Sequence, residues 1–148
     1  MRAHGHGQGY LDLNFLIPEL IERIDYKKGP YCAGVGDFTA AGTVMFSTVD
    51  RLDRPMIEAT VGSYGYYRAL IAGSSAIADG NLLAALDGTL SNGPWDLNEG
   101  LTKINGLVKY SQGTASRSWN LSFTGYHATW NATDQVPERA IQSGLISR

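Results

Sequence analysis

Two histidines and a glutamine near the start of the chain are the side chains best suited to binding a metal ion. His4 and His6 are separated by one glycine, and Gln8 follows two residues later in the same glycine-rich segment. Imidazole nitrogens are common zinc ligands, but a structural zinc site needs four ligands at recognised spacings, and no third ligand accompanies this pair. The sequence therefore predicts no metal site and no cofactor.

Motifs for nucleophilic catalysis or cofactor binding are absent from the sequence. Residues 73–77 (Gly-Ser-Ser-Ala-Ile) lack the second glycine of a nucleophile elbow. Residues 34–36 (Gly-Val-Gly) are not followed by a glycine at the spacing of a dinucleotide-binding loop. The aspartates are scattered, so no general acid can be paired with a general base. We therefore expect no catalytic residue and no enzyme activity.

Composition narrows the class of protein further. Charged residues make up 18% of the 148 residues, against about 25% in typical soluble domains. The net charge of −2 argues against a nucleic-acid-binding surface, which is normally basic. The single cysteine, Cys32, excludes an internal disulfide and a cysteine zinc site. The longest strongly apolar uncharged stretch, Ala69 to Ala78, is too short for a transmembrane helix of about 20 residues but long enough for a transmembrane β-strand of about 9–11.

The elements that position these residues fall into two parts. In residues 1 to about 52, Pro18 followed by Glu19 is typical of the first turn of a helix, which we expect to continue to Arg23. Strands are predicted at 24–26, before Gly29 and Pro30, and at 43–49, where β-branched residues are dense.

From Pro55 onward, apolar and polar residues alternate with a period of two. In the segment from Arg117 to His127, Trp119, Leu121 and Phe123 fall on one face of a strand, and the residues between them are small and polar. The same pattern predicts five strands, at 56–61, 66–76, 81–89, 103–110 and 117–127. We expect a tight Asp-Gly turn at 78–81 and a short turn at 111–116. Longer loops are expected at 91–101 and 131–148.

Two interpretations of this alternation remain open. Long strands with short turns at one end, longer loops at the other and aromatic residues near strand ends are typical of an outer-membrane barrel. The candidates for such aromatic girdles are Tyr64, Tyr66, Tyr67, Tyr110, Trp119, Tyr126 and Trp130. Alternating strands also build soluble sandwiches and small ligand-binding barrels, in which the apolar face points inward.

A longer pattern in the first fifty residues resembles a known family. Residues 21–30 (IERIDYKKGP), the small residues up to Gly42 and the strand at 44–48 resemble the closing segment of the plug domain of TonB-dependent outer-membrane receptors. The residues that carry this match are Glu22, Arg23, Lys28, Gly29, Pro30, Gly36 and Gly42. Lys28 stands where the family usually has arginine. Residues 4–19, 62–65 and 93–95 are similar to one branch of the family.

The resemblance implies a mainly β fold: residues 1–52 would be the C-terminal part of a plug domain, and residues 53–148 would supply about five antiparallel strands of a transmembrane β-barrel. Because such transporters have about 22 strands, it also implies a fragment, with the signal peptide, the TonB box, the first part of the plug and most of the barrel outside this chain.

By the same resemblance, the receptor takes up a scarce nutrient such as a metal–siderophore chelate, cobalamin or a carbohydrate. The implied location is the outer membrane of a Gram-negative bacterium. The implied partners are the TonB energy-transducing complex, the small-molecule or chelate ligand and outer-membrane lipid, and no nucleic acid is expected. The alternatives are a small free-standing β-barrel that binds an apolar ligand, or a surface adhesin.

The resemblance also implies roles for individual residues. His4, His6, Gln8 and Tyr10 match an apical plug loop and are expected to contact the ligand. Trp95 and Trp130 lie beside the longer loops, where they would either stack on the ligand or join an aromatic girdle. The expected lumen-facing side chains are Lys103, Asn105, Lys109, Asn120, Ser122 and Thr124. Those expected to face lipid are Ile104, Val108, Leu121 and Phe123.

Overall fold

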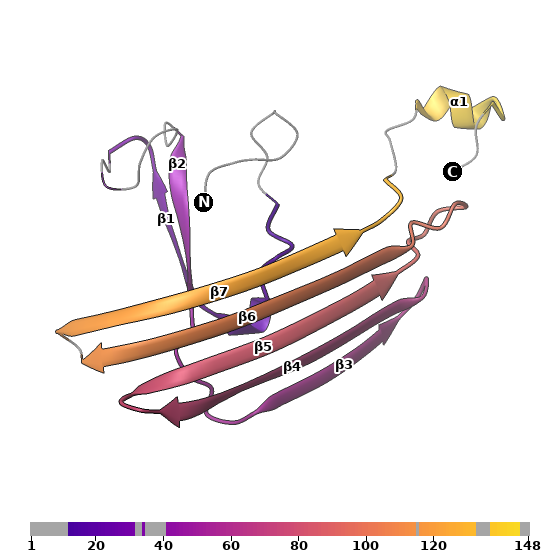
Figure 1. The fold of residues 1–148 in the computed structure, drawn as a ribbon. Helices are drawn as coiled ribbons and strands as arrows, with labels where there is room; N and C mark the ends of the chain where they lie inside the picture. The colour runs from indigo at the N-terminus through magenta and orange to yellow at the C-terminus, as the bar shows by residue number, and fades with distance from the viewer. Residues whose placement is uncertain (1–11, 32–33, 35–40, 115, 133–136, 146–148) are drawn as a thin grey trace. The chain divides into compact units, whose positions relative to one another are not determined.

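The structure is a computed structural model that describes residues 12–31, 34, 41–114, 116–132 and 137–145. The chain divides into two compact units, Met1–Asp50 and Arg51–Arg148. The described strands form two antiparallel sheets, one of two strands and one of five (Figure 1). The prediction of a mainly β protein is therefore confirmed.

The first unit is built around a two-stranded sheet. A single 3-10 turn, Pro18–Leu20, leads directly into β1 (Ile21–Lys28), which pairs with β2 (Gly42–Thr48). The expected helix as far as Arg23 is wrong, because Ile21 and Arg23 pair with Thr48 and Ser47 across the sheet. These cross-strand partners satisfy backbone groups that a short isolated helix would leave open at its ends.

The second unit contains a five-stranded meander in which each strand pairs with the next in the sequence. Its strands are β3 (Met56–Gly62), β4 (Tyr66–Ile77), β5 (Gly80–Ser91), β6 (Leu101–Thr114) and β7 (Arg117–Thr129). All five predicted strands are present, and the structure extends each of them by one to six residues. The four later strands are long, at 12 to 14 residues, against a usual five or six.

Two connections differ from the expectation. Ile77 pairs with Gly80, so the β4–β5 turn consists of Ala78 and Asp79 and is centred one residue earlier than the Asp-Gly pair predicts. Ala78 adopts the left-handed conformation that this tight turn requires, with φ 53°. After β7, the expected loop contains a one-turn helix, α1 (Glu138–Gln142), that begins after Pro137 and has an acidic residue in its first turn.

The buried apolar side chains of the sheet all lie on one of its faces. Leu70 is opposite Asp87, and Ala72, Ala85 and Leu107 are opposite one another across β4, β5 and β6. In the described part of the chain, no helix has the length and hydropathy needed to cross a membrane.

Candidate functional site

The register of the five-stranded sheet separates its side chains into two faces, because residues paired directly across strands point the same way. One face, here called the polar face, carries charged, amide and hydroxyl side chains between its buried leucines and alanines. Its polar members on β4 to β7 include Arg68, Asp87, Thr89, Lys103, Asn105, Lys109, Ser111, Asn120, Ser122 and Thr124. The structure thus brings together on one face all six residues expected to line a lumen.

A largely buried ion pair lies on the polar face, toward the end of β4 that follows residues 63–65. The Arg68 guanidinium Nε donates to the Asp87 carboxylate Oδ2 at 2.6 Å, and the two side chains are 17% and 2% exposed. Charges are buried in proteins only when they are paired, so this contact fixes β4 and β5 together at this point. Sequence reasoning missed both residues, although each is a single charge at a polar-face position of an otherwise apolar strand.

Other polar groups on this face are buried as well. Asp87, Thr89, Asn105, Lys109 and Ser111 all belong to the buried class. The hydroxyl oxygens of Thr89 and Ser111 make no hydrogen bond with the described residues. A buried hydroxyl without a partner costs about 1–3 kcal/mol, so the polar face has hydrogen-bonding capacity that these residues do not use.

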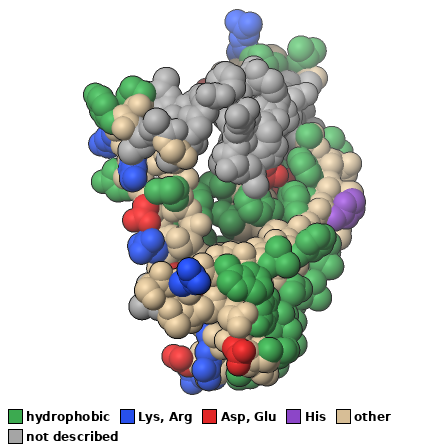
Figure 2. Space-filling view, turned by 60° about the vertical axis from the view of Figure 1, so that its left-hand side comes forward, with side chains coloured by type: hydrophobic (Ala, Val, Ile, Leu, Met, Phe, Trp, Pro, Cys, Tyr) green, Lys and Arg blue, Asp and Glu red, His purple; other side chains and the backbone are tan. Residues whose placement is uncertain are grey.

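The opposite face, here called the apolar face, shows the reverse pattern. Its large side chains are hydrophobic and exposed, among them Leu121 at 69% and Phe123 at 78%. The further exposed members are Ile57, Val61, Tyr67, Ile71, Ile77, Leu86, Leu90, Ile104, Val108 and Trp119. Hydrophobic side chains gather over the outer side of the long strands in Figure 2. Within the strands, the only Arg, Lys, His, Asp or Glu on this face are Arg117 and His127, both near the ends of β7.

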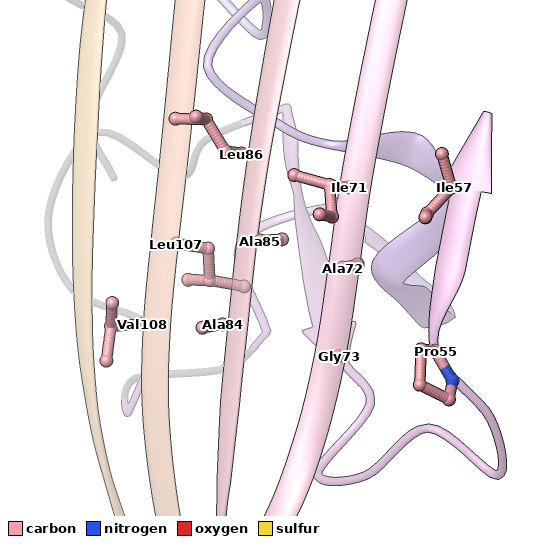
Figure 3. A pocket seen from close by; sticks show the side chains of 10 residues that line it. All are labelled: Pro55, Ile57, Ile71, Ala72, Gly73, Ala84, Ala85, Leu86, Leu107 and Val108. Carbon is pink, nitrogen blue, oxygen red and sulfur yellow. The ribbon is translucent and has the colours of Figure 1, made fainter. Parts of the chain in front are cut away.

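A shallow apolar hollow of about 450 Å³ lies in this face (Figure 3). Small residues create it, because Gly73 and Ala84 are directly opposite one another, beside the larger pair Ile71 and Leu86. Its remaining lining residues are also apolar: Pro55, Ile57 and Val108, together with Ala72, Ala85 and Leu107, which belong to the opposite face by register. Without polar side chains, this hollow can hold apolar groups but cannot perform acid–base chemistry.

Aromatic residues lie at both ends of the long strands, but not all on the apolar face. Tyr110 and Trp119 are on it, with ring centroids 5.4 Å apart, and Tyr67 is on it near the other end. Tyr66 and Tyr126 are opposite Gly62 and Asn105 on the polar face. The expectation that these two join an apolar girdle is wrong, since side chains alternate strictly along a strand.

Backbone hydrogen bonds join three connections at the other end of the sheet from the Ala78 turn. The Asn92 N–H donates to the Tyr64 carbonyl at 2.9 Å, and the Glu99 N–H donates to the Asn92 carbonyl at 2.8 Å. The Asn131 N–H donates to the Glu99 carbonyl at 2.7 Å. Trp95 and Trp130, the two tryptophans singled out from the sequence, are both exposed within or beside these segments.

The residues that the predicted resemblance to a plug domain singled out lie mainly in and after β1. Arg23 and Asp25 form an exposed ion pair at 2.7 Å, and Glu22 and Lys28 are on the same strand. Gly29 has φ 83°, and its N–H donates to the Ala41 carbonyl at 3.0 Å, just before Pro30.

Gly42 is needed because a Cβ there would lie 2.5 Å from the Lys27 carbonyl oxygen. His4, His6, Gln8, Tyr10 and Gly36 lie outside the described residues. Among the residues that are described, no three His, Cys, Asp or Glu side chains gather as a metal site would require.

Comparison with known proteins identified no relative: no protein-family model, no curated protein and no solved structure matches the chain.

Proposed function

We propose that this chain is part of a TonB-dependent outer-membrane receptor, a transporter that takes up a scarce nutrient with energy from the inner membrane. Residues 1–52 are then the closing part of the plug domain, and residues 53–148 supply the first five strands of the barrel. The observation that carries the proposal is the inverted burial of the sheet. Asp87, Asn105 and Lys109 are buried, whereas Leu121 and Phe123 are exposed.

This inversion distinguishes the proposal from a soluble ligand-binding barrel. In a soluble barrel the apolar face encloses the ligand and the polar face meets water. Leu121 and Phe123 would then be buried and Asp87 would be exposed, the opposite of the observed exposures. In a transmembrane barrel the apolar residues face lipid and the polar residues line the interior, in agreement with both faces.

The height of the apolar face also fits a membrane. Gly80 and Leu90 share this face of β5 and are ten residues apart, a distance of roughly 34 Å at about 3.4 Å per residue. A strand tilt of about 40° reduces this to roughly 26 Å, close to the apolar band of about 25 Å in outer-membrane barrels. Tyr110 and Trp119 at one end and Tyr67 at the other suit interfacial positions.

The proposal assigns no bond chemistry to the chain. The polar face lines the lumen, and the ligand is a metal–siderophore chelate, cobalamin or a carbohydrate. Because β3 and β7 are the edges of the described five-stranded sheet, further strands must pair with both edges to close a barrel of about 22 strands. The TonB complex and outer-membrane lipid are the other partners.

Insertion into lipid vesicles tests the membrane part of the proposal. With Trp95→Phe and Trp130→Phe, Trp119 is the sole tryptophan, and a brominated lipid should quench its fluorescence. Phe123→Arg should lower the equilibrium constant for insertion at least about 30-fold, since an arginine near the middle of the lipid face costs about 2–4 kcal/mol. The matched control is Thr124→Arg, one residue away on the polar face.

Equal effects of Phe123→Arg and Thr124→Arg would refute the membrane assignment. A soluble, monodisperse monomer with cooperative melting would refute it as well, because open sheet edges should associate. The receptor part is tested by sequencing the DNA on both sides of the coding segment. A signal peptide and TonB box upstream, with further barrel strands downstream, are expected, whereas an independent short gene would contradict the assignment.

A further inference from the structure

We propose that the loop end of the five-stranded sheet binds an uncharged carbohydrate. The loop end comprises the β3–β4 turn (residues 63–65), the β5–β6 loop (92–100) and the residues after β7 (130–131). This inference rests on the proposed function, because it chooses one class among the nutrients that such a receptor could take up.

The three segments of the loop end form one hydrogen-bonded frame. Backbone hydrogen bonds of 2.7–2.9 Å run in series from the Tyr64 carbonyl through Asn92 and Glu99 to the Asn131 N–H. The Asn131 side-chain amide also donates to the Asn98 carbonyl at 3.2 Å. A frame connected in this way holds its side chains in place before a ligand arrives, which lowers the entropic cost of binding.

Three exposed aromatic rings extend from this frame. Tyr64, Trp95 and Trp130 are 63%, 44% and 51% exposed. In the described part of the chain, the one aromatic ring pair joins Tyr110 and Trp119 at the opposite end of the sheet. The rings of the loop end are therefore open to a ligand. Tyr and Trp offer large, rigid contact surfaces at low entropic cost, and their electron-rich faces attract the C–H groups on the faces of sugar rings.

Hydrogen-bonding groups lie beside one of these rings. A Cβ placed on Gly93 would lie 2.9 Å from both the Glu99 carboxylate Oε2 and the Trp95 Cδ1, so the carboxylate and the indole flank the same glycine. Gly93 has φ 70°, a conformation that L side chains rarely adopt. An aromatic face next to a carboxylate suits a sugar ring, which presents both C–H groups and hydroxyls.

The charge of the loop end selects among ligands. Asp96 and Glu99 are its charged side chains, and residues 63–65, 92–100 and 130–131 contain no Lys or Arg. Within these segments an anionic ligand, such as a phosphate or an acidic sugar, would meet two carboxylates and no cation; in the adjoining strands, Arg68 is paired with Asp87 and Lys103 follows two residues after Leu101. An uncharged carbohydrate meets hydrogen-bond acceptors and amides instead, which can pair with its hydroxyl groups.

An interfacial girdle is the competing role for these rings. Trp119 suits that role, because it lies within β7 on the apolar face. Trp130 lies beyond Thr129, the last residue of β7, and precedes Asn131, whose N–H donates to the Glu99 carbonyl. Trp130 is therefore attached to the frame of the loop end and not to the strand.

A glycan array tests the inference with the full 148-residue chain, kept in a detergent that has no sugar headgroup. The array carries neutral, sialylated and sulfated oligosaccharides, and cyanocobalamin and a ferric hydroxamate chelate are titrated separately by tryptophan fluorescence. We expect binding to neutral oligosaccharides only. Trp95→Ala and Trp130→Ala should each weaken it at least tenfold, whereas the matched aromatic control, Trp119→Ala, should leave it unchanged.

Three results would overturn the inference. The first is no binding to any neutral oligosaccharide, and the second is a preference for acidic oligosaccharides, cyanocobalamin or the ferric hydroxamate chelate. The third is unchanged binding in the Trp95→Ala, Trp130→Ala double variant. Quenching of Trp119 by brominated lipid, measured in vesicles on the Trp95→Phe, Trp130→Phe variant, separates this outcome from the proposed function. Quenching without carbohydrate binding refutes only the inference. Carbohydrate binding without quenching refutes the membrane assignment and leaves the carbohydrate site standing.

Discussion

The ring of Tyr110 lies directly against Gly80. A Cβ on this glycine would lie 2.7 Å from the phenol oxygen of Tyr110 and 2.5 Å from the carbonyl oxygen of Ser111. The Tyr110 hydroxyl reaches the Ile77 carbonyl at 3.5 Å, and the ring packs against Trp119 on the neighbouring strand. Gly80 is therefore required by close packing at the start of β5, and not by the conformation of the turn before it.

Gly80→Ala should consequently destabilise the sheet. The added methyl group has to displace either the Tyr110 ring or backbone, and overpacking of this kind costs about 1–3 kcal/mol. Gly88→Ala is the matched control, since no atom lies within 4 Å of its Cβ position on the same strand. It should be neutral or stabilise by up to about 1 kcal/mol. Denaturant unfolding followed by tryptophan fluorescence measures both, and equal effects would contradict the packing role.

Asp87→Asn should be one of the most damaging single substitutions in the sheet. It replaces the carboxylate that the Arg68 guanidinium contacts at 2.6 Å with a neutral amide, and breaking a largely buried ion pair typically costs about 3–5 kcal/mol. Asp25→Asn removes the carboxylate of the exposed Arg23 pair and should cost less than about 1 kcal/mol. Amide hydrogen exchange in β4 and β5, and in β1 for the control, measures the two effects. A small change in β4 and β5 would show that the buried pair contributes little.

Ser74 fixes the point at which the chain enters the sheet. Its hydroxyl accepts a hydrogen bond from the Leu52 N–H at 2.9 Å and donates one to the Leu52 carbonyl at 3.0 Å. β3 begins only at Met56, opposite Ala72, so among the described residues this part of β4 has no strand partner on that side. One side chain thus satisfies both backbone groups of Leu52.

Ser74→Ala should therefore leave two backbone groups of Leu52 without partners and cost about 1–3 kcal/mol locally. The Leu52 amide should exchange with solvent at least tenfold faster. Ser75→Ala, at the adjacent exposed position, is the control and should leave this exchange rate unchanged. If both variants behave alike, the hydroxyl does not hold the segment.

The two-faced sheet was predictable because alternation is local. Leu121 and Phe123 fall on one face, and Asn120 and Ser122 on the other, from their sequence positions alone. The helix predicted from Pro18 to Arg23 was too long because Ile21 instead pairs with Thr48, which lies 27 positions later. Cross-strand pairing over such a distance outweighs local helix signals. The Asp-Gly turn was misplaced for a similar reason, since the neighbour that demands Gly80 is Tyr110, which lies on the next strand, 30 positions later.

The candidate sites were less predictable than the strands. Sequence patterning placed Asn105 and Lys109 on the polar face, but it gave no sign that Arg68 reaches diagonally to Asp87. It singled out Trp95 and Trp130 one at a time. The hydrogen bonds from Tyr64 through Asn92 and Glu99 to Asn131 connect segments up to 67 positions apart, and their spacing follows no period.

The number of strands restricts how copies of the 148-residue chain can associate. Five antiparallel strands make β3 and β7 run in the same direction. Copies joined head to tail in a ring would then place β7 parallel to the next β3, although antiparallel pairing is the more stable per residue. Two copies can pair antiparallel only by joining like edges. β7 has 13 residues and β3 has seven, so β7 offers the longer ladder.

Full overlap of two β7 strands, Arg117–Thr129, places Phe123 opposite Phe123 of a second copy and keeps both apolar faces on the same side. In a Cys32→Ser background, Phe123→Cys should therefore yield a disulfide-linked dimer under mild oxidation. Ala59→Cys, at the middle of β3, should yield at least several-fold less. Non-reducing electrophoresis measures both. Equal cross-linking at the two positions would show that the chain does not associate preferentially through β7, and more at position 59 would reverse the assignment of the edge.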